Sequence, residues 1–487
     1  MTAQDYENNL RANVANLLIP NNRLQMQILT PLKLHLWHTI GMIRKAQDNL
    51  ASWFREPSRK PIVIRGARQV GKSTLVRNFA KQVGIPIVEI NLERHPHLDE
   101  VFASLNMEQI IDALENLPRV ARISSSSLLF LDEIQATPHA LAALRYFYED
   151  RPELPVIAAG SLLEFALNDH DFSMPVGRVN YLHLGPMSFS EFLVGCGEDQ
   201  HSLTLENFSI ENPLSKAAHK HLSELFQSYS LVGGMPEAVA DFSQNRQLSR
   251  CREIHQSILD TYRDDFSKYG LKQDLPRLHH VLNHALLYLG KKIKYTDILP
   301  GEQSRTVRRL LDLLIQARLF VKIPHSHGNG IPLSAEASPT VFKLQFVDIG
   351  LFQTVRGSPL VPLGANQNHL HLGAVTEQLV GQEMLANAPL FFRPHLYYWL
   401  REGRTGNAEL DFLVGIGDQV IPVEVKSGTD GRMRSLNLFC QAKESKIAFR
   451  FDQNLASSHS LSNGTRLLSL PYFAAGQLER LAKTQVK

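Results

Sequence analysis

One glycine-rich stretch limits what this chain can fold into more than any other feature. Residues 66–73 read Gly-Ala-Arg-Gln-Val-Gly-Lys-Ser, which matches the GxxxxGK[ST] pattern of a phosphate-binding loop. The apolar run at 62–64 predicts a buried strand before the loop, and residues 74–81 have a helical pattern after it, which is the context that the motif requires. The stretch therefore predicts a nucleoside triphosphate site.

The residues of this loop have distinct expected roles. Glycines at 66 and 71 let consecutive backbone N–H groups turn inward on the phosphates. Lys72 is expected to reach the β and γ phosphates, and the Ser73 hydroxyl is expected to hold Mg²⁺. The predicted nucleotide-binding set in the loop is Gly66, Ala67, Arg68, Gln69, Val70, Gly71, Lys72, Ser73 and Thr74.

Two acids follow a second buried strand and complete the predicted site. The run at 128–131 is apolar, and Asp132 and Glu133 come directly after it. A nucleoside triphosphate site needs a carboxylate that organises the metal and a group that positions the attacking water. We expect Asp132 to help hold Mg²⁺ and Glu133 to activate the water.

A third apolar run, at 155–159, is followed by Gly160 and Ser161. The Ser161 hydroxyl either senses the γ phosphate or caps the following helix, because serine is a frequent N-cap residue. Strands and helices alternate from residue 62 to about 192. This alternation predicts a doubly wound parallel sheet of the α/β class.

Together these motifs resemble the AAA+ ATPases, specifically a group in which the ATPase is fused to a C-terminal domain of unknown function that resembles a restriction endonuclease. The resemblance covers about residues 43–450, through segments 60–72, 131–135, 160–161, 177–178, 186–192 and 233–236. It implies ATP and Mg²⁺ as cofactors and ATP hydrolysis as the activity. It also nominates Arg178 as an arginine that reaches a neighbouring subunit's site in a homo-oligomer; the alternative is a solvated side chain.

Changes of pattern along the chain predict several regions. A length of 487 residues fits about three domains at ~150 residues each. The predicted regions are an N-terminal appendage (1–42), an AAA+ P-loop domain (43–192), a helical lid-like region (193–275), a winged-helix-like region (276–347) and a restriction-endonuclease-like α/β domain (348–487).

The segment 291–322 concentrates positive charge. It holds eight basic residues against three acidic ones, although the formal net charge of the chain is only +3. Helical periodicity and a strand-like run at 341–346 favour a winged helix whose basic face meets DNA. The alternative is a solvated amphipathic helix. The predicted apolar face holds Val307, Leu310, Leu311 and Leu314, and the opposite face holds Arg305, Arg308, Arg309 and Gln316.

Two later strand patterns carry charged residues at alternating positions. Glu409 and Asp411 share one strand face, and Glu424 and Lys426 share a face of the next strand. A hairpin can bring these faces together, where two carboxylates and a lysine can hold Mg²⁺ and orient a water. Surface charges are the alternative, but they do not explain why Glu424 lies inside the apolar run at 420–425.

This spacing resembles the PD-(D/E)xK nuclease core, and Glu377 on the preceding predicted helix matches the extra acid of the Holliday-junction-resolvase type. The resemblance implies Glu377, Asp411, Glu424 and Lys426 as catalytic residues, with Asp411 and Glu424 as metal ligands. Glu409 is either a further member of this site or a residue that supports the others without contacting the metal itself. The leading hypothesis is an ATP-hydrolysing protein with a metal-dependent nuclease domain acting on DNA. The alternative is an ATP-controlled switch whose C-terminal fold recognises DNA or protein without cleavage.

Composition excludes other classes of protein. Hydrophobic residues make up 44% and charged residues 20%, which is ordinary globular usage and excludes collagen-like or low-complexity chains. The three cysteines form no C-x-x-C pair, so they predict neither a zinc site nor a disulfide framework. The first residues lack a secretory pattern, and no apolar run reaches the ~18 residues of a membrane helix, so we expect a cytoplasmic protein.

Overall fold

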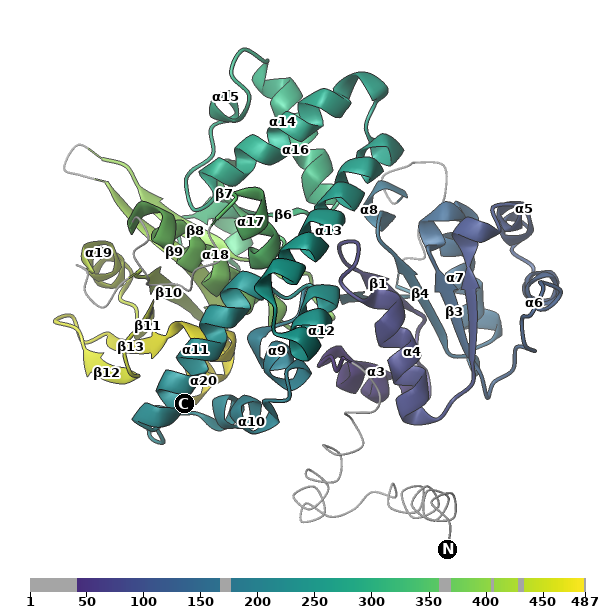
Figure 1. Ribbon diagram of the computed structural model, residues 1–487, viewed down its shortest axis with the longest axis horizontal. Helices are drawn as coiled ribbons and strands as arrows, with labels where there is room; N and C mark the ends of the chain where they lie inside the picture. Colours follow the sequence, from purple (N-terminus) through teal and green to yellow (C-terminus); the bar gives the residue numbers. More distant parts are fainter. Residues whose placement is uncertain (1–41, 167–176, 359–368, 404–406, 428–432, 486–487) are drawn as a thin grey trace, which may run out of the picture. The chain divides into compact units, whose positions relative to one another are not determined.

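A five-stranded sheet forms the core of the N-terminal half. Its strands are β1 (Ile62–Arg65), β2 (Ile87–Asn91), β3 (Leu128–Asp132), β4 (Val156–Gly160) and β5 (Asn180–His183). They lie in the order β2-β3-β4-β1-β5, and every neighbouring pair is parallel (Figure 1). Strands β3 and β4 are buried at every position, as expected when helices cover both faces of a sheet. The predicted doubly wound α/β fold is confirmed.

Six helices accompany this sheet: α3 (Ala46–Phe54), α4 (Lys72–Val83), α5 (Leu98–Ala103), α6 (Met107–Glu115), α7 (Pro138–Asp150) and α8 (Leu163–Ala166). Local sequence explains several of their ends. The Asn106 side chain accepts hydrogen bonds from two backbone N–H groups at the start of α6, and α7 begins with Pro138, whose missing N–H costs nothing there. Leu141, Leu144 and Phe147 of α7 pack into the apolar core beside β3 and β4.

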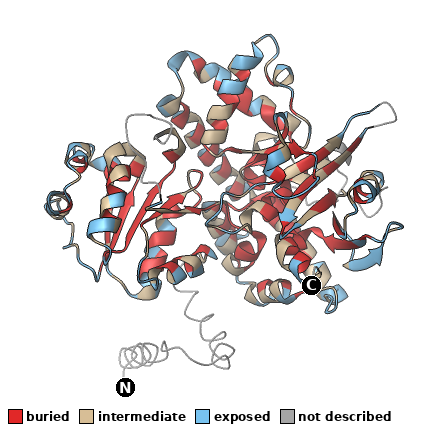
Figure 2. Ribbon diagram, turned by 180° about the vertical axis from the view of Figure 1, so that it is seen from behind, coloured by how far each residue is buried: buried red, intermediate tan, exposed pale blue. Residues whose placement is uncertain are grey.

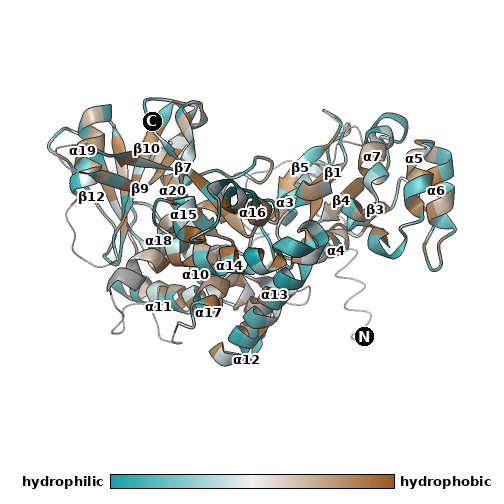
Figure 3. Cartoon of the chain, turned by 90° about the horizontal axis from the view of Figure 1, so that it is seen from above, coloured by the Kyte–Doolittle hydropathy of each residue, from teal (hydrophilic) through white to brown (hydrophobic). Residues whose placement is uncertain are grey.

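A helical region follows the sheet. It consists of α9 (Phe189–Gly195), α10 (Asp199–Asn207), α11 (Lys216–Val232), α12 (Pro236–Asn245) and α13 (Leu248–Tyr269). Ser188 and Glu191 form a capping box at the start of α9, with each side chain bonding the other residue's backbone N–H. In Figure 3 α13 carries much hydrophilic surface, whereas β1 and β4 are largely hydrophobic, as their burial requires.

The region predicted as winged-helix-like, with the basic segment at its centre, contains three helices and a hairpin: α14 (Leu275–Ala285), α15 (Tyr295–Ile298), α16 (Ser304–Gln316), β6 (Phe320–Ser326) and β7 (Ala337–Phe346). Helix α16 buries the four apolar residues predicted from periodicity and exposes Arg305, Arg308 and Arg309. These helices precede an antiparallel hairpin, and the winged-helix assignment stays a prediction. The same hairpin also continues into a larger sheet, because His325 of β6 pairs with Tyr398 of the next strand.

The C-terminal half holds a mixed eight-stranded sheet. Its further strands are β8 (Tyr397–Arg401), β9 (Ala408–Ile416), β10 (Gln419–Val425), β11 (Ile447–Asp452), β12 (Ser457–Ser460) and β13 (Arg466–Pro471). The strand order is β12-β13-β11-β10-β9-β8-β6-β7. Strands β9 and β10 form the antiparallel hairpin that the charge pattern predicted. The accompanying helices are α17 (Ile349–Val355), α18 (His369–Ala386), α19 (Arg434–Lys443) and α20 (Leu478–Gln485).

The computed structural model describes residues 42–166, 177–358, 369–403, 407–427 and 433–485. Nearly all of the N-terminal appendage predicted at 1–42 lies outside these residues. Arg44 to Lys487 form one compact unit, in which the strands of both sheets are mostly buried (Figure 2). Among the described helices, none is long and apolar enough to cross a membrane.

Candidate functional site

The phosphate loop lies at the carboxyl edge of the parallel sheet, between the end of β1 and the start of α4. Gly71 precedes α4 with φ of 89°, a left-handed conformation that glycine adopts without steric cost. A Cβ atom on Gly66 would lie 2.2 Å from the carbonyl oxygen of Leu184. Both glycines of the motif are therefore required by the backbone.

The Lys72 side chain points into this loop. The residue is 8% exposed, and its Nζ donates hydrogen bonds to the carbonyl oxygens of Gly66 at 3.2 Å and Ala67 at 2.9 Å. Burial lowers the pKa of Lys72 to about 8, against the opposing effect of the Glu133 and Asp132 carboxylates. A desolvated ammonium of this kind gains a large electrostatic stabilisation from phosphate oxygens.

Ser73 and Asp132 lie together at the start of α4 and the end of β3. The Ser73 hydroxyl donates a hydrogen bond to Asp132 Oδ2 at 2.7 Å. Burial raises the pKa of Asp132, and the Ser73 hydrogen bond opposes this shift. A hydroxyl and a carboxylate this close offer the hard oxygen donors that Mg²⁺ prefers. The residues present thus fit a Mg²⁺ ion, which Ser73 and Asp132 would hold beside the phosphates.

Glu133 is held in an unusual backbone conformation beside Asp132. Its φ is 52°, in the left-handed region, and a non-glycine residue in that region is strained unless its surroundings fix it. Gln135 Nε2 donates a hydrogen bond to Glu133 Oε2 at 2.6 Å, and Gln135 also packs against Gly160, where a Cβ would lie 2.1 Å from Gln135 Oε1. Gln135 therefore links the predicted base to the end of β4.

The neighbouring Ser161 has a buried hydroxyl. The residue is 4% exposed, and its Oγ has no hydrogen-bond partner within the described residues. An unpaired buried hydroxyl costs free energy unless a ligand satisfies it. This geometry favours a contact with bound nucleotide over helix capping, and the sensor role stays a prediction.

Helix α13 crosses the phosphate loop from the helical region. Arg68 of the loop donates hydrogen bonds to both carboxylate oxygens of Asp265, at 2.9 and 2.7 Å, and Tyr262 donates one to the Arg68 carbonyl at 2.9 Å. Phe165 and Tyr269 stack with ring centroids 4.3 Å apart. The pattern of α13 alone does not reveal these contacts, because each of them joins α13 to residues more than a hundred positions earlier in the chain.

A second, partly buried ion pair joins the ATPase half to the basic segment. Arg318, directly before β6, donates a hydrogen bond from Nη2 to Glu164 Oε1 at 2.6 Å, and Arg65 Nη1 lies 3.6 Å from the same oxygen. Burial lowers the pKa of Arg318, while Glu164 raises it. Arg318 was expected only as one of the charges of the basic segment; the structure places it partly buried against Glu164.

Arg178 lies near the start of β5, and its side chain is half-exposed. Its Nε pairs with Glu149 Oε1 of α7 at 2.8 Å. This contact is on the surface of the same ATPase half and involves no residue of the phosphate loop. The role of Arg178 in a neighbouring subunit's site stays a prediction.

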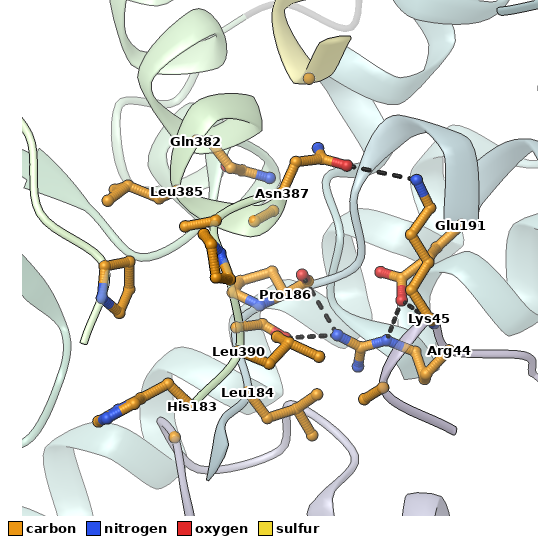
Figure 4. A pocket seen from close by; sticks show the side chains of 18 of the residues that line it. Arg44, Lys45, His183, Leu184, Pro186, Glu191, Gln382, Leu385, Asn387 and Leu390 are labelled. Carbon is orange, nitrogen blue, oxygen red and sulfur yellow. Dashed lines mark hydrogen bonds and ion pairs between the residues drawn. The ribbon is translucent and has the colours of Figure 1, made fainter. Parts of the chain in front are cut away.

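A cavity of about 680 Å³ borders the phosphate loop. Gly66, Ala67 and His183 line it, together with α18 residues such as Gln382. Arg44 fixes one wall by donating hydrogen bonds to the carboxylate of Glu191 (Figure 4) and to the carbonyls of Gly185 and Val70. The cavity thus brings loop residues close to residues from the C-terminal half.

The C-terminal acids meet around a lysine that sequence reasoning missed. Lys343 of β7 is 1% exposed, and its Nζ lies 2.5 Å from Glu409 Oε1, 3.1 Å from Glu377 Oε1 and 4.0 Å from Asp411 Oδ1. Burial raises the pKa of Glu377 to about 8, although the Lys343 charge acts against this shift. Only the position of Lys343 between two apolar residues of its strand hinted at a role.

The predicted nuclease residues of the β9-β10 hairpin also come together. Asp411 Oδ2 accepts a hydrogen bond from the Val425 N–H at 2.7 Å, and Lys426 Nζ forms an ion pair with Glu424 Oε1. Burial raises the pKa of Glu424 to about 7, and the nearby Asp411 charge raises it as well. The four carboxylates and two lysines therefore form one cluster.

Asp411 and Glu424 each have an oxygen that a metal ion could bind. Glu424 Oε2 is buried and has no hydrogen-bond partner in the described part of the chain, and Asp411 Oδ1 lies 4.0 Å from Lys343, beyond hydrogen-bond distance. Paired carboxylate oxygens are suitable ligands for Mg²⁺ or Mn²⁺. Asp411 and Glu424, the predicted metal ligands, thus fit a divalent ion.

Another group of possible ligands lies between α10 and α11. Glu198 Oε2 is 2.9 Å from His201 Nδ1 and 3.6 Å from His221 Nε2. The three ligand atoms lie within 4.8 Å of one another. Two imidazoles and a carboxylate are donors that Zn²⁺ accepts, so this surface group must be distinguished from the C-terminal cluster in any metal-binding experiment.

Comparison with known families divides the chain into three matched segments. Residues 58–193 match an AAA domain, residues 223–361 match a domain of unknown function (DUF8612), and residues 372–473 match another (DUF4143). The AAA match covers the phosphate loop and the Asp132-Glu133 pair. The protein contains an AAA+ P-loop domain and is an ATPase.

Individual proteins are similar over limited stretches or at low identity. Midasin of Giardia intestinalis is 33% identical over 99 residues, which are 20% of this chain and 2% of midasin. The Walker-type ATPase paby2304 of Pyrococcus abyssi shares 16% identity at a TM-score of 0.40, over 65% of this chain and 96% of that one. The ORC1 protein of Aeropyrum pernix, solved in complex with DNA, shares 13% identity at a TM-score of 0.28, over 67% of this chain and 96% of that one.

Exchanging Glu133 for glutamine should separate ATP binding from hydrolysis. Glu133→Gln keeps the hydrogen-bonding shape but removes the base, so we expect nucleotide affinity near wild type and turnover lower by about 10²-fold or more. Lys72→Ala should instead abolish nucleotide binding. Fluorescent-nucleotide titration and phosphate release measure the two effects, with Glu108→Gln on exposed α6 as the control. Wild-type turnover in Glu133→Gln would assign the base elsewhere.

The pKa of Lys72 predicts a pH dependence of nucleotide affinity. Because its pKa in the folded protein is about 8, below its ordinary value, the ammonium is present below that pH and is lost above it. The Kd for MgATP should therefore rise with pH above about 8, by up to about tenfold per pH unit. Lys72→Arg stays charged, so any binding it retains should lose this dependence. A flat wild-type profile between pH 7 and 9.5 would contradict the prediction.

Proposed function

We propose that this ATPase acts on DNA and that ATP turnover controls a C-terminal acidic site able to hydrolyse phosphodiester bonds. The observation that carries the proposal is the meeting of Asp411, Glu424 and Lys426 in one cluster with Glu377. This combination of side chains supports phosphodiester chemistry because it can bind a divalent ion and neutralise a phosphate.

The residues of the cluster divide this work. A divalent ion bound by Asp411 and Glu424 would supply Lewis-acid chemistry and lower the pKa of a bound water. Lys426 is held beside Glu424, where its ammonium can approach a scissile phosphate and stabilise the charge that develops on it. The Val425 N–H keeps Asp411 oriented through Oδ2 and leaves Oδ1 toward the cluster. These contacts support a prearranged site.

Helix α16 is the proposed DNA contact. Arg305 and Arg308 are exposed, and Arg308 has only a loose pair with Asp312 at 3.8 Å. Arg309 differs, because its Nη2 lies 2.8 Å from Asp274, whose side chain is 1% exposed. Arg309 therefore stabilises the helix packing, and Arg305 and Arg308 are the residues available to phosphates.

One continuous stretch of chain connects the ATP site to both of these elements. Helix α13 holds Arg68 of the phosphate loop and leads through α14 to α16. Arg318 follows α16, pairs with Glu164 beside the ATP site, and is followed by the β6-β7 hairpin that carries Lys343. A change at the phosphates could thus reach the basic helix and the acidic cluster by the same route.

A second candidate is a switch whose C-terminal fold binds DNA or protein without cutting. One observation favours it: Lys343 and Lys426 already pair with three of the carboxylates, Glu377, Glu409 and Glu424. In that case the cluster would serve as a rigid ion-pair network rather than as a catalytic site.

Reversing charge on α16 should weaken DNA binding. We expect Arg305→Glu with Arg308→Glu to lower affinity and to flatten the plot of log K against log salt, since each lost phosphate contact removes a slope of roughly 0.9. Fluorescence anisotropy at several salt concentrations measures both quantities. Lys220→Glu, on exposed α11, is the matched control, and Arg309 stays unchanged because it pairs with buried Asp274. Equal slopes for wild type and variant would assign this face to solvent.

The nuclease proposal predicts separable losses of activity. Asp411→Asn and Lys426→Ala should each lower DNA cleavage by at least about 10²-fold while ATP turnover stays near wild type. Branched, single-stranded and duplex substrates are incubated with Mg²⁺ or Mn²⁺, with and without ATP. Asp418→Asn, in the turn of the same hairpin, is the control. If the wild-type protein binds DNA and hydrolyses ATP but cuts none of these substrates, the nuclease function is refuted and the switch becomes the proposed function.

A further inference from the structure

Lys343 is a buried cation surrounded by carboxylates from other elements. Glu377 comes from α18, and Glu409 and Asp411 come from β9. Transfer of an ammonium group from water to the protein interior costs several kcal/mol of free energy unless carboxylates compensate its charge. The full burial of Lys343 therefore requires these partners. The pair with Glu409, at 2.5 Å, and the pair with Glu377, at 3.1 Å, supply that compensation.

Lys343 and two neighbouring elements lie close to the Glu377 carboxylate. A Cβ atom on Gly290 would lie 2.9 Å from Glu377 Oε2, so the backbone at Gly290 closes this side of the carboxylate. On another side, the ring of Tyr398 lies 5.2 Å from Lys343 Nζ. While Lys343 pairs with Glu377 and Glu409, its ammonium occupies the position that a divalent ion with its several waters would need beside these two carboxylates.

Asp411 and Glu424, on β9 and β10, are not held by Lys343 in the same way. Glu424 Oε2 is buried without a partner among the described residues, and Asp411 Oδ1 has Lys343 only at 4.0 Å. The carboxylates thus fall into two groups. Lys343 holds Glu377 and Glu409, and Asp411 and Glu424 keep one oxygen each for a ligand.

We propose that Lys343 is a resident cation that takes the place of a second metal ion, so that this cluster binds one divalent ion through Asp411 and Glu424. Glu377 is then the ion-pair partner of Lys343 and not a metal ligand. An ammonium neutralises negative charge as a metal does, but it offers no open coordination position for water. Activation of a water by metal therefore depends on one ion. Lys343 neutralises the negative charge of Glu377 and Glu409, the other half of the cluster.

The number of metal ions that the cluster binds tests this proposal. Only the catalytic consequence of that number rests on the proposed function. Mn²⁺ is titrated into full-length, nucleotide-free protein, with free Mn²⁺ followed by electron paramagnetic resonance. We compare the number of Mn²⁺ equivalents bound by the wild type with the number bound by Asp411→Asn. The difference counts only ions in the C-terminal cluster, because ions at Ser73 and at the Glu198-His201-His221 group bind to both proteins. We expect one such equivalent in the wild type, and Glu377→Gln should retain it with a Kd within about threefold.

Removing the lysine charge should create the missing metal site. Lys343→Met leaves Glu377 and Glu409 without their cation, so we expect a second Mn²⁺ equivalent and a larger rise of Tm with Mn²⁺ than in the wild type. Lys322→Met on neighbouring β6 is the control and should behave as wild type. The proposal would be overturned if the cluster of the wild type bound two Mn²⁺ equivalents or none. It would also be overturned if Glu377→Gln lost the single equivalent.

The Glu377→Gln result decides the role of Glu377 even if Lys343→Met fails to fold. The experiment contains no DNA, so an absence of cleavage by the wild type refutes the nuclease function without affecting the stoichiometry. Conversely, a wrong stoichiometry refutes the role of Lys343 while cleavage can still be observed.

Discussion

The requirement that every buried charge be paired shapes both halves of this protein. Lys72 and Lys343 are almost fully buried, and Arg318 is largely so, yet each has oxygen partners at 2.5 to 3.2 Å. Removing one partner would leave a desolvated charge, which costs about 3–5 kcal/mol. The elements that supply these partners are therefore held at fixed positions. In the ATP site the partners of Lys72 are carbonyls that phosphate can replace, whereas those of Lys343 are carboxylates of the protein itself.

The two sites are assembled by different geometric means. Parallel strands β1, β3 and β4 all end at one edge of their sheet, so the loop, Asp132 and Ser161 meet there as a consequence of topology. The C-terminal cluster instead needs β7, α18, β9 and β10 to pack correctly before its charges meet. Short local motifs thus determine the first site, and tertiary packing determines the second.

This difference explains how much could be predicted from the sequence. The phosphate loop, the acids after β3 and the doubly wound sheet follow from contiguous residues and from periodicity. The alternation in β9 and β10 correctly indicated that Asp411 and Glu424 would approach each other. Lys343, Asp265 and Arg318 were missed as site residues, since each has its partner between 34 and 197 positions away. No local period marks such pairs; only the packed structure identifies them.

The position of Arg318 gives a physical basis for communication between the sites. Its guanidinium is buried against Glu164, which follows β4 and Ser161, while its backbone lies between α16 and β6. Arg318 is also close enough to Lys72 to lower the pKa of that ammonium, although burial is the main cause. A nucleotide phosphate would add negative charge beside both cations and compete with Glu164 for Arg318. Because β6 follows Arg318 and pairs with β7, the proposed control of the acidic cluster by ATP would pass through the strand that carries Lys343.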